Sequence, residues 1–253
     1  MRRRISPDCR VFFDVFAGTG VVGRHFKQQG FRVVANDIQY YAYCLNRAQI
    51  GINHVPRFRN APVDRRGHRC RLDAVLAYLN GLTGIEGFVV QHYCSDSDQG
   101  KGRMYFTNVN GLRCDAIRMK VEEWRSFGMI TASEYFYLLA CLIDGMDRVA
   151  NTASVYAAYL KHFKKTSRKP LQLTPIPIIW SQYRHSAFNL DGSVLVGRVH
   201  CDVMYMDPPY NQRQYCTNYH VLETIARYDC PKVYGVTGLR PYADQKSDFC
   251  RKH

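Results

Sequence analysis

The chain has 253 residues, 46% of them hydrophobic, which is enough for one large or two modest domains with a buried core. No apolar run approaches the roughly 18 residues of a membrane-spanning helix, and Met1-Arg2-Arg3-Arg4 leads into no hydrophobic signal core, so we expect a cytoplasmic protein. The 35 Lys and Arg against 21 Asp and Glu give a formal net charge of +14. That balance favours a polyanionic partner, nucleic acid first, and the alternative is charge that only keeps the protein in solution.

The ten cysteines are scattered from Cys9 to Cys250 without any C-x-x-C pair. We therefore expect reduced, mostly packed thiols and no metal site. A site assembled from distant Cys and His is the alternative, and nothing in the spacing indicates one.

The first elements predict a strand, a helix and a second strand. Residues 11–16 are an apolar strand, Ala17-Gly18-Thr19-Gly20 turns it into a helix that ends at Gly30, and residues 31–35 form a strand that ends at Asn36-Asp37. Gly18 and Gly20 let the backbone approach a ligand at the helix amino terminus, while Asp37 can accept hydrogen bonds from two ribose hydroxyls. This predicts an adenosine-containing cofactor. Because Gly18 to Gly23 also match G-x-G-x-x-G, an NAD-type fold is the competing interpretation.

Beyond a helix over residues 38–53, the strand-helix alternation stops from about Pro56 to Pro177. A basic irregular stretch, 56–71, precedes a helix with apolar residues at core spacing that Gly81 ends. The Asn110-Gly111 turn signal predicts a small hairpin between residues 104 and 118. Three further helices follow: one around residues 117–124, one from the capping box at 131–134 to about 150, and one over 154–165.

The last of these predicted helices mixes cations with aromatics: Tyr159, Lys161, Lys164 and Lys165. A phosphate backbone and unstacked bases could both use such a mixture, so these residues are candidates for DNA binding. The alternative is a solvated helix end whose lysines complement the helix dipole.

The chain then returns to strand patterns. Asp191 would lie at a strand tip, where it could meet the cofactor's adenine amino group, although a helix-capping or turn aspartate is the alternative. Residues 203–206 are apolar and predict a buried strand, directly before Asp207-Pro208-Pro209-Tyr210. A last helix is expected over residues 218–228.

The Asp207-Pro208-Pro209-Tyr210 stretch lies past the carboxyl end of a strand, where open α/β sheets bind ligands. The prolines can join neither a ladder nor a helix, which leaves the Pro208 carbonyl free to accept a hydrogen bond beside the Asp207 carboxylate. With the aromatic face of Tyr210, these acceptors suit a nucleobase that carries an exocyclic amine. A rigid turn with an exposed tyrosine is the alternative.

Asp14-Val15-Phe16-Ala17-Gly18-Thr19-Gly20 together with the Asp-Pro-Pro-Tyr stretch resembles the paired signature of amino-methyltransferases that use S-adenosylmethionine. The order of glycine motif, long insertion, acidic strand tip and Asp-Pro-Pro-Tyr is similar to the Dam-like alpha group of adenine-specific DNA methyltransferases. That resemblance implies an α/β, Rossmann-like class I fold over residues 1–55 and 178–253, with residues 56–177 as a mostly helical DNA-recognition insertion.

The resemblance also implies roles for individual residues. Asp14, Phe16, Gly18 and Gly20 would hold the methionine part of S-adenosylmethionine, Asp37 its ribose and Asp191 its adenine. Asp207, Pro208, Pro209 and Tyr210 would hold the target adenine, which is flipped out of the duplex and methylated at N6 in a restriction-modification context. The alternatives are an inactive DNA-binding remnant and an RNA or protein N-methyltransferase.

The chain departs from the family pattern at both ends. Only residues 1–10 precede the first strand, and the further strands expected after Asp-Pro-Pro-Tyr are missing before His253. We therefore expect an incomplete sheet whose edge strand is exposed, in a truncated protein or a fragment. A second polypeptide could supply the missing strands.

Overall fold

The structure is a computed structural model that describes residues 5–95, 102–209 and 214–250. The chain divides into two compact units. The sheet unit comprises Met1–Val55, Ile176–Arg213 and Ser247–His253, and the helical unit comprises Pro56–Pro175 and Gln214–Lys246. The first boundaries lie close to those expected from the sequence, but residues 214–246 group with the helical unit and not with the sheet.

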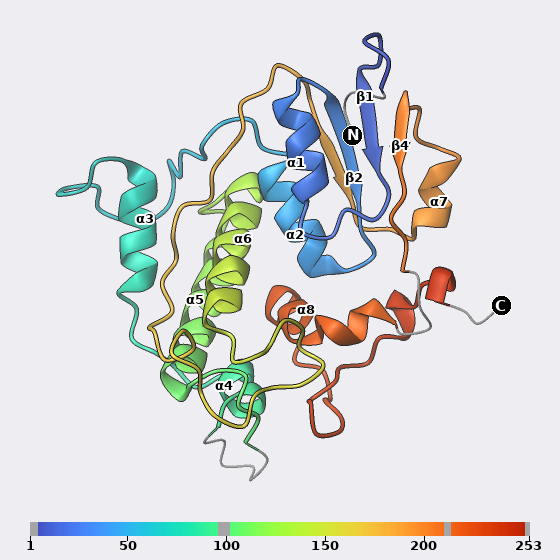
Figure 1. The fold of residues 1–253 in the computed structure, drawn as a ribbon. Coiled ribbons are helices and arrows are strands. Elements are labelled where there is room, and N and C mark those ends of the chain that lie inside the picture. Colours follow the sequence, from blue (N-terminus) through green and yellow to red (C-terminus); the bar gives the residue numbers. More distant parts are fainter. Residues whose placement is uncertain (1–4, 96–101, 210–213, 251–253) are drawn as a thin grey trace. The chain divides into compact units, whose positions relative to one another are not determined.

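The sheet unit is built on four parallel strands in the order β3-β2-β1-β4, as far as the described residues show (Figure 1). The strands are β1 (Val11–Asp14), β2 (Arg32–Asn36), β3 (Ser186–Phe188) and β4 (Val203–Tyr205). Chain order reverses between β1 and β4, because β2 and β3 extend the sheet to one side of β1 while β4 pairs on the other. This confirms the α/β, Rossmann-like class of fold.

Alternating side chains on β1 and β2 face opposite sides of the sheet, as strand geometry requires. Phe12 and Val33 pack in one apolar cluster with Phe26, and Phe13 and Val34 pack in another with Leu195. Phe12 stacks on Phe26 with ring centroids 3.8 Å apart. Burying one such aromatic side chain stabilises the fold by about 2 kcal/mol.

Three helices cover this sheet: α1 (Val21–Gln28), α2 (Tyr40–Gln49) and the short α7 (Gly192–Val196). Figure 1 shows α1 and α2 on one side of the sheet and α7 on the other. The buried Lys27 of α1 donates to the carbonyls of Gln49, Ile50 and Ile52 at 3.3, 2.8 and 2.7 Å. It thereby fixes the end of α2 against α1, and burial lowers its pKa to about 8.

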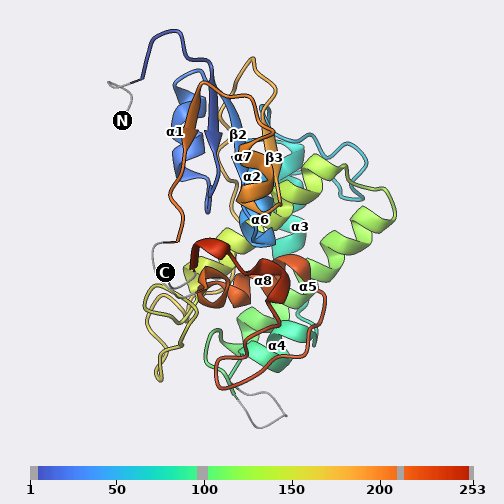
Figure 2. The same cartoon turned by 90° about the vertical axis from the view of Figure 1, so that its right-hand side faces the viewer.

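The helical unit contains α3 (Arg71–Asn80), α4 (Phe88–Tyr93), α5 (Asn108–Ser126), α6 (Ala132–Val149) and α8 (His220–Arg227), seen from a second side in Figure 2. Short 3-10 helices span Tyr215–Asn218, Ala243–Gln245 and, in the sheet unit, Asp248–Cys250. The predicted capping box is confirmed, since the Thr131 and Glu134 side chains bond reciprocally to each other's backbone N–H. The helices predicted before Gly81 and near the chain end are also confirmed.

The predicted hairpin between residues 104 and 118 is wrong. Thr107 caps α5 instead, and Asn110 and Gly111 lie in its first turns. The Asn110 side chain donates to the Lys169 carbonyl at 2.9 Å and accepts from the Leu171 N–H at 2.7 Å. The Asn110 side chain therefore bonds to a distant segment of the chain. In a turn it would have bonded to its own neighbouring backbone.

The helix predicted over residues 154–165 is also wrong, because this segment is irregular. Asn151, fully buried, donates to the Met104 and Leu160 carbonyls at 3.0 and 2.9 Å. Its side-chain oxygen accepts from the Lys164 N–H at 3.1 Å and from the Ser167 hydroxyl at 3.3 Å. The loop's backbone groups therefore find partners that a helix would not give them.

The apolar strand before Asp207 was expected to be buried, and it is not. β4 is an edge of the described sheet, where Met204 and Met206 are 37% and 45% exposed. Most of the ten cysteines are buried, as expected. Among the described residues, every helix is too short or too polar to cross a membrane.

Candidate functional site

Three aspartates lie at or just past the carboxyl ends of neighbouring parallel strands. Asp14 ends β1, Asp37 follows β2, and Asp207 lies two residues beyond β4. Asp14 pairs with Tyr205 across the sheet, and the Val15 N–H donates to the Tyr205 carbonyl at 3.1 Å. The glycine motif and the start of the Asp-Pro-Pro-Tyr stretch therefore share one edge of the sheet, although about 190 residues separate them in the chain.

The second motif is described in part. Asp207 is exposed, and Pro208 and Pro209 are half-buried. Tyr210 lies outside the described residues. The Asp207 carboxylate is in hydrogen-bond contact with the Tyr205 hydroxyl and otherwise faces solvent.

Two side chains, Asp37 after β2 and Asn46 in α2, hold the turn after β1. Gly18 donates its N–H to the Asp37 carboxylate at 2.8 Å, and Asn46 donates to the Gly18 carbonyl at 2.9 Å. Gly20 has φ +76°, and a Cβ there would lie 2.7 Å from the Asn46 side-chain oxygen. Position 20 therefore needs glycine for its backbone angle and for this close approach.

Asp14 is the electrostatic centre of the site. The side chain is 1% exposed, and no donor among the described residues completes a hydrogen bond with either carboxylate oxygen. Burial raises the pKa of Asp14 from 3.8 to about 7, the negative charge of Asp37 adds to the rise, and Asp207 contributes further. The backbone N–H groups of Gly23 and Phe16 oppose it only in part.

Two asparagines that the sequence analysis missed fix the strand ends. Asn36, the last residue of β2, donates to the carbonyls of Val15 and Leu190 at 3.1 and 3.0 Å, and accepts from the Leu190 N–H. Asn189 donates to the carbonyls of Asp37 and Ile38 at 2.8 and 2.9 Å. A pair of asparagines, each one or two residues from a predicted site aspartate, was the signal that could have identified them.

Asp191 lies three residues past β3 and caps α7. Its carboxylate accepts from the Ser193 N–H and hydroxyl, both at 2.8 Å. A Cβ on the neighbouring Gly192 would lie 2.9 Å from Val15 and 3.3 Å from the ring of Phe16. Asp191 and the half-buried Phe16 therefore belong to the same sheet edge as Asp14, although Asp191 serves as a cap in this structure.

The residues predicted to bind DNA lie in the helical unit, on the irregular segment after α6. Lys161 and Lys165 are exposed, as a phosphate contact requires. Lys164 is half-buried, and its ammonium donates to the Thr152 carbonyl at 2.8 Å. The Tyr159 ring packs edge-on against Tyr105, with centroids 5.1 Å apart. Lys164 and Tyr159 therefore have structural contacts of their own.

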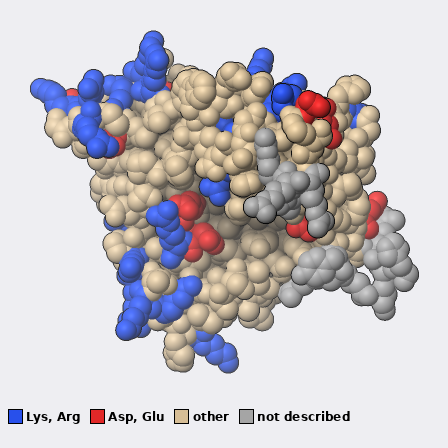
Figure 3. Space-filling model, turned by 45° about the horizontal axis from the view of Figure 1, so that its top comes forward, with Lys and Arg blue, Asp and Glu red and all other residues tan. Residues whose placement is uncertain are grey.

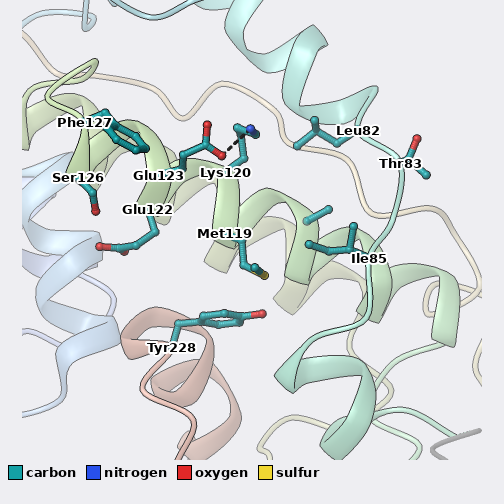
Figure 4. Close-up of a pocket in the computed structure, with 11 residues that line it drawn as sticks. Leu82, Thr83, Ile85, Met119, Lys120, Glu122, Glu123, Ser126, Phe127 and Tyr228 are labelled. Atoms are coloured by element: carbon teal, nitrogen blue, oxygen red, sulfur yellow. Dashed lines mark hydrogen bonds and ion pairs between the residues drawn. The ribbon is translucent and has the colours of Figure 1, made fainter.

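A pocket of about 630 Å³ opens beside α5 in the helical unit (Figure 4). Its walls are mostly apolar, with Ile85, Met119 and Tyr228 among them, and Glu123 forms an ion pair with Lys120 at 2.6 Å. None of the residues predicted for catalysis, cofactor or DNA lines it. The candidate catalytic site is therefore not this pocket but the end of the sheet where the strands have their carboxyl ends.

The sheet edge suits a cationic ligand with hydroxyl groups. A buried carboxylate that the neighbouring N–H groups compensate only in part is costly, and a ligand ammonium would supply both charge and hydrogen bonds to Asp14. The glycine turn leaves room for such a ligand beside the backbone. No group of His, Cys, Asp and Glu among the described residues is arranged to hold a metal ion.

Comparisons with known proteins point the same way. Residues 2–253 match the family described as D12 class N6 adenine-specific DNA methyltransferase. The chain is 43% identical to the Type II methyltransferase M.NlaIII of Neisseria lactamica, over 96% of this chain and 68% of that protein. It is 38% identical to the Type II methyltransferase M.FokI of Planomicrobium okeanokoites and 34% identical to the Modification methylase StsI of Streptococcus sanguinis. These matches cover 100% and 96% of this chain but only 38% and 36% of those proteins. No solved structure matches the chain significantly.

Proposed function

Because the chain belongs to the D12 class of N6 adenine-specific DNA methyltransferases, we propose that it transfers a methyl group from S-adenosylmethionine to N6 of adenine in DNA. The observation that carries this proposal is the pairing of β1 with β4, which brings the glycine turn and Asp207 to one sheet edge. The other interpretations, an inactive DNA-binding remnant and an RNA or protein methyltransferase, are not favoured by the relatives. Nor do the relatives support a second polypeptide.

The cofactor would be held by the edge formed by β1, β2 and β3. The buried Asp14 carboxylate would accept from the ammonium of its methionine part, with Phe16, Gly18 and Gly20 around it. Asp37 would bind the ribose hydroxyls and Asp191 the adenine, each exchanging a present backbone partner for the ligand. Bound there, S-adenosylmethionine supplies a methyl group activated by its sulfonium.

The target adenine would be held by the acceptors past β4. Its N6 is a weak nucleophile because the lone pair is delocalised into the ring. Asp207 and the Pro208 carbonyl would accept both amino hydrogens, which lets the nitrogen pyramidalise and stabilises the charge that develops. Pro209 keeps this backbone rigid, and Tyr210 would stack on the flipped base. Holding N6 in line with the methyl group contributes most, on the order of 7 to 11 kcal/mol of the barrier.

The helical unit would recognise DNA, with Tyr159, Lys161, Lys164 and Lys165 as the residues predicted for contact. The names of the relatives, "Type II methyltransferase" and "Modification methylase", favour a role in restriction-modification. Such an enzyme would work in the cytoplasm.

Asp207→Ala tests the proposal. We expect this variant to lose tritiated-methyl incorporation into mixed-sequence duplex DNA by at least 100-fold, while calorimetry shows S-adenosylmethionine binding within a few-fold of wild type. Asp8→Ala is the matched control, since Asp8 is an exposed aspartate ahead of the amino end of β1. Methyl transfer by Asp207→Ala at the wild-type rate would exclude the proposed role of Asp207.

A further inference from the structure

The loop of residues 56–70, which precedes α3, carries a basic surface besides the lysines of residues 161–165. We name it the arginine loop. We infer that the arginine loop binds the phosphate backbone of DNA without reading its sequence. The inference rests on the proposed function for its partner, a DNA duplex. The exposed cationic side chains of the loop are those of Arg57, Arg59, Arg65, Arg66 and Arg69.

The charges of this loop are largely uncompensated. Arg66 pairs with Asp64 at 2.8 Å and Arg69 with Asp73 at 3.7 Å, but both arginines are more than nine-tenths exposed. Such solvent-exposed pairs are weak and are broken readily by a stronger anion. In the part of the chain that the structure describes, Arg57, Arg59 and Arg65 make no ion pair.

Buried anchors hold the loop in place. Phe58, between the two arginines Arg57 and Arg59, is fully buried and donates its N–H to the Glu134 carboxylate. The Arg71 guanidinium donates to the carbonyl of Phe58 and, at 2.6 Å, to that of Ala61. Because these contacts hold the backbone, the exposed side chains on either side of Phe58 project from a fixed base.

The backbone at Phe58 is strained. Its φ is +49°, a left-handed conformation that a bulky side chain rarely adopts. The ring, packed edge-on against Tyr137 with centroids 6.3 Å apart, and the bond to Glu134 together hold it there. Strain that the surrounding structure maintains is characteristic of functional segments, whereas a loop that only carries solubility charge has no need of it.

The type of cation fits phosphate. Arginine presents a planar fork of donors that matches phosphate oxygens, and it is less strongly hydrated than lysine. In Figure 3 blue side chains with few red ones cover the leftmost part of the surface, where the arginine loop and α3 lie. Contacts of this kind fix the position of a duplex and carry no information on its sequence.

The test compares two double variants of the full chain that remove equal charge. Arg57→Ala/Arg59→Ala changes the arginine loop. Arg32→Ala/Arg198→Ala is the control, because both arginines are exposed and neither belongs to the loop: Arg32 begins β2, and Arg198 lies between α7 and β4. Binding of a fluorescent duplex is measured by anisotropy from about 50 to 200 mM salt, with duplexes of unrelated sequence.

We expect the loop variant to lose affinity for every duplex. The plot of log K against log salt should also become less steep, by about 1.8 in slope. This is about 0.9 for each of the two phosphates that an arginine no longer neutralises. The control should keep the wild-type slope, and Arg57→Lys/Arg59→Lys should restore most of it. Equal slopes for the loop variant and wild type would overturn the inference, as would a wild-type chain that binds no duplex.

The binding assay needs no methyl transfer, so the two proposals can fail separately. If the wild-type chain transfers methyl groups and the loop variant keeps the wild-type slope, only the proposed phosphate binding by the arginine loop is refuted. A slope change in a chain that transfers no methyl group would leave the loop's role standing and refute the proposed function.

Discussion

Replacing Asp14 by asparagine should change stability and ligand binding in opposite directions. The substitution keeps the shape of the side chain and removes its charge. Since burial and the charge of Asp37 outweigh the backbone N–H groups of Gly23 and Phe16, the charged form of Asp14 is destabilising in the free protein. We expect Asp14→Asn to gain stability over wild type as the pH rises and to bind S-adenosylmethionine about 10- to 100-fold more weakly, through loss of one charge-assisted hydrogen bond.

The magnitude follows from the pKa of Asp14, which the fold raises from 3.8 to about 7, chiefly by burial and then by the charge of Asp37. A folded-state pKa above the unfolded value means that the folded chain binds the proton more tightly. Stability therefore falls as the pH rises from about 3.8 to about 7 and is constant above that. The full loss is about 4 kcal/mol, of which about 3 kcal/mol develops between pH 4.5 and pH 8.

Urea denaturation without cofactor at pH 4.5 and pH 8 measures this difference. The free energy of unfolding of Asp14→Asn, relative to wild type, should be about 3 kcal/mol higher at pH 8 than at pH 4.5. The exposed Asp8→Asn is the control and should show no such change. A relative stability of Asp14→Asn that is the same at both pH values would refute the burial of a charged Asp14.

Three further outcomes are expected. Binding of S-adenosylmethionine should release close to one proton from Asp14 at pH 6 and almost none at pH 8.5. Calorimetry in buffers of different ionisation enthalpy measures this release. Binding heats at pH 6 that are the same in every buffer would contradict it. Gly20→Ala should lower the free energy of unfolding by at least about 1 kcal/mol, because of its positive φ and the nearby Asn46 oxygen, and should weaken cofactor binding; unchanged affinity would argue against a cofactor at this turn. Asn151→Ala should speed tryptic cleavage at Lys161, since each carbonyl it leaves unpaired costs about 1 to 3 kcal/mol; cleavage at the wild-type rate would mean that Asn151 does not hold the loop.

Local patterns predicted the elements whose stabilising contacts are close in sequence. The β1-α1-β2 unit follows from two apolar runs and the glycines between them, and α6 follows from its capping box at Thr131. The pairing of β1 with β4 could be expected because parallel α/β sheets bring the carboxyl ends of their strands to one edge.

The errors lie where distant contacts override local signals. Asn110-Gly111 is a turn signal, but Asn110 bonds to Lys169 and Leu171, some 60 residues away, and stays in α5. The loop expected to be a helix is held by Asn151, which bonds within the loop to Leu160 and Lys164 and also to Met104, 47 residues before it. The partners Lys169, Leu171 and Met104 lie outside the windows in which periodicity is measured.

In the proposed mechanism Asp14 and Asp207 would have different tasks, because their environments differ. Asp14 is buried and only weakly compensated by the backbone N–H groups of Gly23 and Phe16, so a cation that reaches it would gain a strong interaction. Asp207 lies past an edge strand and is exposed, so a base can reach it from outside the sheet. The β1-β4 register is what keeps the two side by side, because Asp14 pairs with Tyr205, two residues before Asp207. A one-residue slip of β4 would turn Tyr205 to the other face of the sheet and carry Asp207 away from its place beside the glycine turn. Methyl transfer would therefore depend on the pairing of these two strands as strictly as on the aspartates themselves.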